Sequence, residues 1–218
     1  MSKYEYILFD MDGTITDSYD AVVNSFAYAL DYWGISDYDK GSMKEILGPP
    51  LRESFVKLFG FDEATALEAV AKYRERYRVH YLEEHKIYPG INELFEKLTA
   101  RGYKLVLATS KPLEFATKIL ERHGLEGFFY FLGGASMEAK RDTKEKVLDY
   151  IFESCDIPRD KAVLVGDRCY DMAGAEYAGI DAIGVLYGYG DREELSAYKN
   201  VFLANTTEDI YDFLENGI

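Results

Sequence analysis

Acidic side chains follow two apolar stretches of this sequence that have the composition of buried strands. Asp10 and Asp12 come directly after the stretch from Tyr4 to Phe9, and Asp167 and Asp171 come after a second apolar run. On an extended chain, residues two apart project to the same side, so the first two carboxylates are expected to act on one site. A carboxylate can attack phosphorus, and a second one can move the proton. Oxygen ligands of this kind also suit Mg²⁺, which binds substrate phosphate as well.

Hydroxyl and lysine side chains occupy comparable places elsewhere in the chain. Thr109, Ser110 and Lys111 follow another apolar run, and Lys144 begins the helix that precedes the run before Asp167. In an open α/β sheet, ligands collect at the carboxyl ends of the strands. We therefore expect these groups to converge at one edge, where Thr109 and Ser110 would bind phosphate and Lys144 would neutralise its charge. Alone, each motif is as well explained by a turn or a helix cap; together, they indicate phosphoryl transfer.

The elements that position these residues alternate between strand and helix. Several predicted strands are continuously apolar, which is typical of a parallel sheet that is covered on both faces. The pattern predicts a doubly wound α/β core of the Rossmann type. The predicted strands are 4–9, 105–108, 128–132, 162–165 and 182–186, and the helices between them lie near 93–100, 112–124, 143–154 and 172–178.

A purely helical stretch separates the first predicted strand from the others. It begins with a helix capped by Asp17 or Ser18, continues with one opened by Pro49-Pro50, and ends with a long helix that starts near Asp62. An insertion of this length predicts a second domain. We expect residues 1–16 and 88–218 to form the α/β catalytic core and residues 17–87 to form an all-helical cap domain.

The composition limits the possible partners. The 218 residues carry a formal net charge of −14, which argues against binding to a nucleic acid polymer. The segment from Arg101 to Lys146 is the exception, because it holds nine Lys and Arg against six Asp and Glu and suits an anion. No apolar run is long enough to cross a bilayer, and no signal-peptide segment is evident at the N-terminus. We expect a cytoplasmic protein without a membrane partner, a monomer or a homodimer, that acts on a small phosphorylated metabolite.

The combined motifs resemble those of the haloacid dehalogenase superfamily of phosphatases. They are Asp10-Met-Asp12-Gly-Thr, Thr109-Ser110-Lys111-Pro112, Lys144 and Gly166-Asp167-Arg-Cys-Tyr-Asp171. The resemblance extends over essentially the whole chain. Gly48-Pro49-Pro50-Leu51 and Tyr187-Gly188-Tyr189-Gly190 are similar to the phosphoglycolate phosphatase-like branch, which has a helical cap.

The resemblance implies a role for each matching residue. It makes Asp10 the nucleophile and a magnesium ligand, and it makes Asp12 the general acid and base, which binds magnesium through its backbone carbonyl. Thr109 would bind phosphate and Asp167 would be the third metal ligand. Asp171 would support the metal-bound waters or the catalytic lysine.

The catalytic lysine is less clearly marked than the aspartates. Many members of the superfamily have Lys-Pro-x-Pro here, whereas this chain reads Lys140-Arg-Asp-Thr-Lys144. We assign Lys144, because it starts the helix whose apolar side is Val147, Leu148 and Ile151, and we keep Lys140 as the alternative.

Residues for substrate recognition are predicted from local context. Arg52 lies in the first turn of a cap helix, where a cation is unfavourable, so it is a candidate substrate contact, and Lys111 is another. The alternative for Arg52 is a surface pair with Glu45 or Glu53. The predicted reaction is Mg²⁺-dependent hydrolysis of a small phosphomonoester, such as phosphoglycolate or a nucleoside monophosphate, through an aspartyl phosphate.

Other functions are compatible with parts of the pattern. An inorganic pyrophosphatase or a sugar-phosphate mutase would use the same core and differ at the cap. A phospho-receiver signalling module would also have an acidic cluster, a hydroxyl and a lysine on a doubly wound sheet. Receivers lack an insertion after the first strand, and their acidic pair precedes a separate acceptor aspartate, so this alternative fits less well.

Overall fold

The computed structural model describes residues 3–137 and 140–217, and of residues 40–42 it describes the backbone but not the side chains. The described chain divides into two compact units, one made of Met1–Asp17 with Ile87–Ile218 and the other of Ser18–Lys86. We call them the core unit and the inserted unit. No helix among the described residues is long and apolar enough to cross a membrane.

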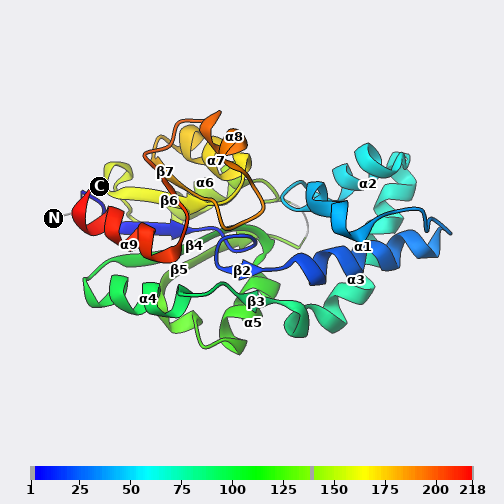
Figure 1. Ribbon diagram of the computed structural model, residues 1–218, viewed down its shortest axis with the longest axis horizontal. Coiled ribbons are helices and arrows are strands. Elements are labelled where there is room, and N and C mark those ends of the chain that lie inside the picture. The colour runs from blue at the N-terminus through cyan, green and yellow to red at the C-terminus, as the bar shows by residue number, and fades with distance from the viewer. Residues whose placement is uncertain (1–2, 138–139, 218) are drawn as a thin grey trace. The chain divides into compact units, whose positions relative to one another are not determined.

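The core unit is built on a parallel sheet. Its strands lie in the order β5-β4-β1-β6-β7-β8, and every pair of neighbours is parallel. Figure 1 shows α6 and α7 on one face of this sheet and α4 and α5 on the other. The predicted doubly wound α/β class is therefore confirmed. The strands are β1 (Tyr6–Phe9), β4 (Lys104–Pro112), β5 (Phe129–Ala135), β6 (Ala162–Gly166), β7 (Asp181–Val185) and β8 (Phe202–Ala204).

The helices of the core unit connect these strands. Two of them have candidate site residues in their first turn: α6 (Lys144–Ser154), which Thr143 caps, and α7 (Cys169–Ala178). The others are α4 (Ile91–Ala100), α5 (Leu113–Arg122), α8 (Arg192–Ser196), α9 (Thr207–Asn216) and the short 3₁₀ segments Glu126–Phe128 and Arg159–Lys161. The strand β8 and the helices α8 and α9 were not among the predicted elements.

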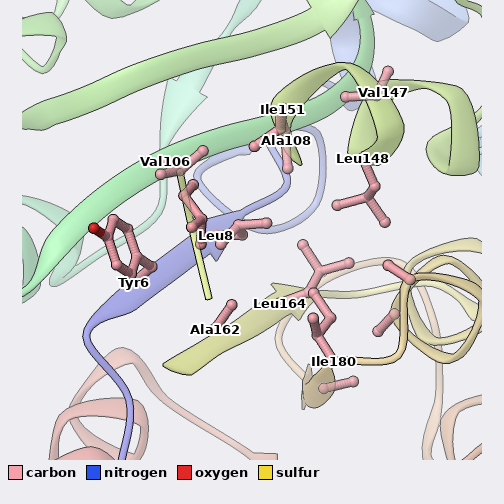
Figure 2. Packing of buried hydrophobic residues seen from close by; sticks show 14 of the residues in the cluster. Tyr6, Leu8, Val106, Ala108, Val147, Leu148, Ile151, Ala162, Leu164 and Ile180 are labelled. Atoms are coloured by element: carbon pink, nitrogen blue, oxygen red, sulfur yellow. The ribbon is translucent and has the colours of Figure 1, made fainter. Parts of the chain in front are cut away.

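The hydrophobic core fixes the sheet against its helices. Leu8, Val106 and Leu164, from the three central strands, are fully buried and pack with side chains of α6 and α7. Figure 2 shows Leu148 and Ile151 of α6 directed toward these strand residues. Each buried Leu contributes roughly 1.5–3 kcal/mol to folding. The carboxyl ends of β1, β4 and β6 are thereby held as one rigid edge.

The inserted unit is mainly helical. Its helices are α1 (Tyr19–Tyr32), α2 (Leu51–Phe59) and α3 (Glu63–Glu84), with a 3₁₀ segment at Lys40–Ile46. Ser18 stands at the N-cap of α1 without a side-chain cap hydrogen bond, whereas Asp62 caps α3 by accepting from the Thr65 N–H. The two short strands β2 (Thr16–Asp17) and β3 (Lys86–Ile87) pair where the chain passes between the units. The unit boundaries lie one residue from those predicted, and the role of the inserted unit as a cap remains a prediction.

Candidate active site

The first aspartate is placed by the register of the central strands. Phe9, the last residue of β1, lies level with Leu107 of β4 and Val165 of β6. Asp10 follows, and its N–H donates to the Val165 carbonyl at 2.9 Å. Its side chain is only 13% exposed. The Asp10 carboxylate therefore stands at the carboxyl edge of the sheet with a fixed backbone beneath it.

Lys144 connects this aspartate to a second one. Its Nζ lies 2.8 Å from Asp10 Oδ1, 2.7 Å from Asp171 Oδ1 and 2.7 Å from the Ala108 carbonyl oxygen. Burial alone would lower the pKa of Lys144, but the two carboxylates outweigh it and raise that pKa above its ordinary value. The ammonium group therefore stays charged and holds both carboxylates. Lys140, the alternative, is exposed, and its backbone N–H donates to the Ser136 hydroxyl at 3.1 Å.

Asp167 is enclosed on all sides. It is fully buried, and its Oδ2 accepts the Tyr189 N–H at 2.8 Å while its Oδ1 accepts the Thr14 hydroxyl at 3.3 Å. A Cβ added to Gly13 would lie 2.0 Å from Asp167 Oδ2, and one added to Gly188 would lie 2.4 Å from Asp167 Cβ. Only glycine allows the backbone to approach so closely at these two places, so the enclosure of Asp167 depends on both.

The cluster has the properties of a cation site. Ligand atoms of Asp10, Asp167 and Asp171 lie within 4.8 Å of one another. Burial raises the pKa of Asp10 to about 6, in spite of Lys144, and burial with the neighbouring charges of Asp171 and Asp10 raises the pKa of Asp167 well above its ordinary value. Crowded buried carboxylates of this kind are stabilised by a bound cation, and oxygen ligands suit a hard divalent ion. The residues present therefore fit a metal ion.

Asp12 and the residues after β4 form a neighbouring group. The Asp12 side chain is 29% exposed and pairs with Lys111 Nζ, 2.7 Å from its Oδ2. Thr109 is buried, and its hydroxyl accepts the Lys111 N–H at 3.1 Å, while Ser110 is half-buried. The structure thus brings Lys111 to Asp12. Phosphate binding by Thr109 and Ser110, and metal binding by the Asp12 carbonyl, remain predictions.

Arg52 belongs to the inserted unit, in the first turn of α2. Its guanidinium is exposed and pairs with Glu63. Arg52 therefore forms a surface ion pair as the alternative predicted, but the predicted partner, Glu45 or Glu53, is wrong. The actual partner, Glu63, begins α3 and is brought close to Arg52 only by the fold. Contact between Arg52 and a substrate remains a prediction.

Three contributions to the site were not foreseen: the Thr14 hydroxyl, the Tyr189 N–H and the Ala108 carbonyl. The last two are backbone groups, so no residue type marks them. A signal existed for Tyr189, because the Tyr187–Gly190 segment alternates glycine with tyrosine directly after β7. Alternate glycines after a strand indicate a close backbone approach.

The amino-acid sequence is similar to those of known proteins. Residues 7–185 match the family model described as haloacid dehalogenase-like hydrolase. A 5'-nucleotidase of Pseudomonas aeruginosa is 39% identical over 197 residues, which are 90% of this chain and 89% of that protein. A phosphoglycolate phosphatase of Vibrio parahaemolyticus is 28% identical and covers 94% of both chains.

A solved structure extends the similarity to three dimensions. The crystal structure of a predicted phosphatase from Clostridium acetobutylicum has a TM-score of 0.92 and 39% identity, and the match covers 96% of this chain and 97% of that one. The matched length includes the inserted unit, which a receiver module lacks, so the receiver alternative is wrong. The chain belongs to the haloacid dehalogenase-like hydrolase family, and within it to the phosphatases.

Proposed function

We propose that this protein is a Mg²⁺-dependent phosphatase that hydrolyses a small phosphomonoester through an aspartyl phosphate on Asp10. The observation that carries the proposal is the buried Asp10 carboxylate, which Lys144 holds at 2.8 Å beside the Asp167 and Asp171 carboxylates. A carboxylate fixed in this way is preorganised for attack, because it needs no further ordering when the substrate arrives.

The reaction divides into two displacements at phosphorus. In the first, an Asp10 oxygen bonds to phosphorus while the bond to the leaving oxygen breaks, and Asp12 gives that oxygen its proton. In the second, Asp12 takes a proton from water, the water oxygen bonds to phosphorus, and Asp10 is released as a carboxylate. Lys144 stabilises the negative charge near Asp10 in both steps.

Asp10 and Asp167, with the Asp12 carbonyl, would hold the magnesium ion. Bound there, the ion would supply charge neutralisation for the phosphoryl oxygens. Asp171 serves a different purpose, since its Oδ1 is paired with Lys144 and its Oδ2 accepts the Arg168 N–H at 3.0 Å. We infer that Asp171 orients the catalytic lysine.

The substrate is a small phosphorylated metabolite, and a nucleoside 5'-monophosphate is the first candidate. The similarity to the 5'-nucleotidase, at 39% identity over most of both chains, supports this choice. Phosphoglycolate follows, and pyrophosphate or a sugar phosphate would indicate the alternative activities on the same core. The cap role of residues 17–87, a cytoplasmic location and a monomeric or homodimeric state belong to the same proposal, and light scattering tests the last of these.

A panel of phosphorylated metabolites assayed for phosphate release tests the function. Activity should require Mg²⁺, disappear with a chelator, and be inhibited by Ca²⁺, whose larger and looser coordination shell would spoil the position of Asp10 for attack. No release from any member of the panel, p-nitrophenyl phosphate included, would refute the proposal. Restoration by zinc alone would show that the metal-ligand assignment is wrong.

A further inference from the structure

The strand β4 is irregular at the point where it reaches the site. From Val106 to Thr109 its residues pair one to one with β5, so that Thr109 lies level with Gly134, and the next pair is Pro112 with Ala135. Ser110 and Lys111 thus have no opposite residues in β5. Such a bulge bends a strand and redirects its side chains, and bulges are frequent beside active sites.

The bulge fits closely against β5. A Cβ added to Gly134 would lie 3.1 Å from the Lys111 carbonyl oxygen and 3.0 Å from Leu113 Cα. The Lys111 N–H is held as well, because it donates to the Thr109 hydroxyl. The backbone from which the Lys111 side chain starts is therefore fixed.

The Lys111 side chain runs inward from this bulge. It is 5% exposed, and its Nζ lies 2.7 Å from Asp12 Oδ2. A lysine is rarely buried unless it is paired. The site accordingly contains two buried lysines, Lys144, which pairs with Asp10 and Asp171, and Lys111, which pairs with Asp12. One belongs to the predicted nucleophile and the other to the predicted acid and base.

We propose that Lys111 is the positioning residue for Asp12. It holds the Asp12 carboxyl group where it gives a proton to the leaving oxygen and later takes one from water, and it meets the negative charge that Asp12 carries between these transfers. The Asp12 side chain is 29% exposed, and the Thr16 hydroxyl donates to its Oδ1 at 3.5 Å, a longer contact than the 2.7 Å between Lys111 Nζ and Asp12 Oδ2. This inference rests on the proposed function, and it differs from the expectation that Lys111 contacts the substrate.

The inference is tested with two esters that differ in their need for an acid. p-Nitrophenolate leaves without much help from a proton, whereas an alkoxide needs one. For Lys111→Met, we expect kcat/KM for an alkyl phosphate to fall at least about tenfold more than for p-nitrophenyl phosphate, since general acid catalysis contributes about 10²–10⁴-fold. kcat/KM is the right quantity because it reports on steps up to departure of the leaving group. For the same variant, the inhibition constant of inorganic phosphate should stay within about threefold of the wild-type value, which is well below a tenfold change in affinity.

Control variants separate positioning from folding. Lys111→Arg keeps the charge and should restore part of the alkyl phosphate activity. Lys118→Met changes an exposed lysine on α5 that pairs with Glu114, and it should leave both esters unchanged. In an Asp12→Asn background, Lys111→Met should have no additional effect, because the group that it positions is already lost.

Three results would overturn the inference. Equal losses on both esters together with weaker inhibition by phosphate would show that Lys111 binds the phosphoryl group. Unchanged kcat/KM for both esters would show that the pair has no role in the reaction. Equal losses that follow a lower melting temperature in both Lys111 variants would show that its role is structural. Turnover of p-nitrophenyl phosphate by the wild type tests the proposed function separately. If the wild type is inactive, both the proposed function and this inference fail.

Discussion

Gly174 lies inside α7, where the helix gives no conformational reason for a glycine. Replacing glycine with alanine in a helix interior usually stabilises it by about 1 kcal/mol. Here, a Cβ added to Gly174 would lie 2.5 Å from Lys144 Cγ and 3.3 Å from Leu148 Cδ1. The glycine therefore makes room for the side chain of the predicted catalytic lysine.

The size of the effect follows from how Lys144 is held. Its ammonium group is fixed by Asp10, Asp171 and the Ala108 carbonyl, so the chain cannot swing away without breaking these contacts. An ordinary carbon–carbon contact of about 3.5–4.0 Å requires a shift of roughly 1 Å. A shift of that size in a catalytic group reduces turnover about 10²-fold. For Gly174→Ala, overpacking lowers the free energy of unfolding by about 1–3 kcal/mol, whereas the better helix propensity of alanine raises it by about 1 kcal/mol. The net loss of unfolding free energy is therefore about 0–2 kcal/mol.

The assay compares turnover of p-nitrophenyl phosphate at saturating Mg²⁺ with the free energy of unfolding in urea. Gly127→Ala is the matched control, because a Cβ added there meets nothing within 4 Å. We expect Gly174→Ala to remain folded and to lose about 10²-fold in kcat, and Gly127→Ala to retain both properties. Turnover of Gly174→Ala within a factor of about two of wild type, an energy difference below 0.5 kcal/mol, would refute the reasoning, since Lys144 would then tolerate displacement.

Other predictions concern the nucleophile, the inserted unit and pH. Asp10→Asn should abolish turnover and leave thermal unfolding nearly unchanged, because the amide is nearly isosteric but not nucleophilic; near-normal activity of the folded variant would exclude the covalent mechanism. Arg52→Ala should raise KM for the physiological substrate but not for p-nitrophenyl phosphate, and equal effects on both would indicate a folding role. Burial raises the pKa of Asp10 to about 6, so this group is mainly a carboxylate at pH 7 and mainly protonated at pH 5. Below pH 6, Mg²⁺ affinity measured by calorimetry should therefore fall at least about tenfold per pH unit, because Asp10 must be deprotonated to bind the ion and Asp167 must be as well; a constant affinity from pH 5 to 7 would contradict this.

The main residues of the site could be predicted because each follows or precedes an apolar strand. Parallel strands bring their carboxyl ends to one edge, so the positions of Asp10 and Asp167 along the chain were enough to place them together. Lys144 could be chosen over Lys140 by helical periodicity, since the apolar face that starts with it packs on the sheet. The structure pairs Lys144 with Asp10 at 2.8 Å.

Other features could not be predicted from residue types. The direction of Lys111 depends on a bulge that is defined only by the register between β4 and β5. The strand β8, Phe202–Ala204, is too short to show alternation. The helix α9 is different, because Thr206 and Asp209 form a capping box at its start, and this pattern could have been recognised in the sequence. Arg52 pairs with Glu63, eleven residues along the chain and in another helix, which local spacing does not reveal.

The charges of the site predict the order in which its ligands bind. The site holds two ammonium groups, those of Lys111 and Lys144, and four carboxylates, those of Asp10, Asp12, Asp167 and Asp171. Asp12 is counted with the other three because its charge is close enough to raise the pKa of Asp10. The neighbouring Arg168 pairs with Glu194 at 2.9 Å and adds no net charge. When all four carboxylates are ionised, two negative charges remain, which is what one divalent cation neutralises. A phosphate dianion that arrives first then meets repulsion that is strong in a buried site. Inorganic phosphate should therefore bind measurably by calorimetry only when Mg²⁺ is present, and equal phosphate affinity with and without Mg²⁺ would show that the lysines alone attract the substrate.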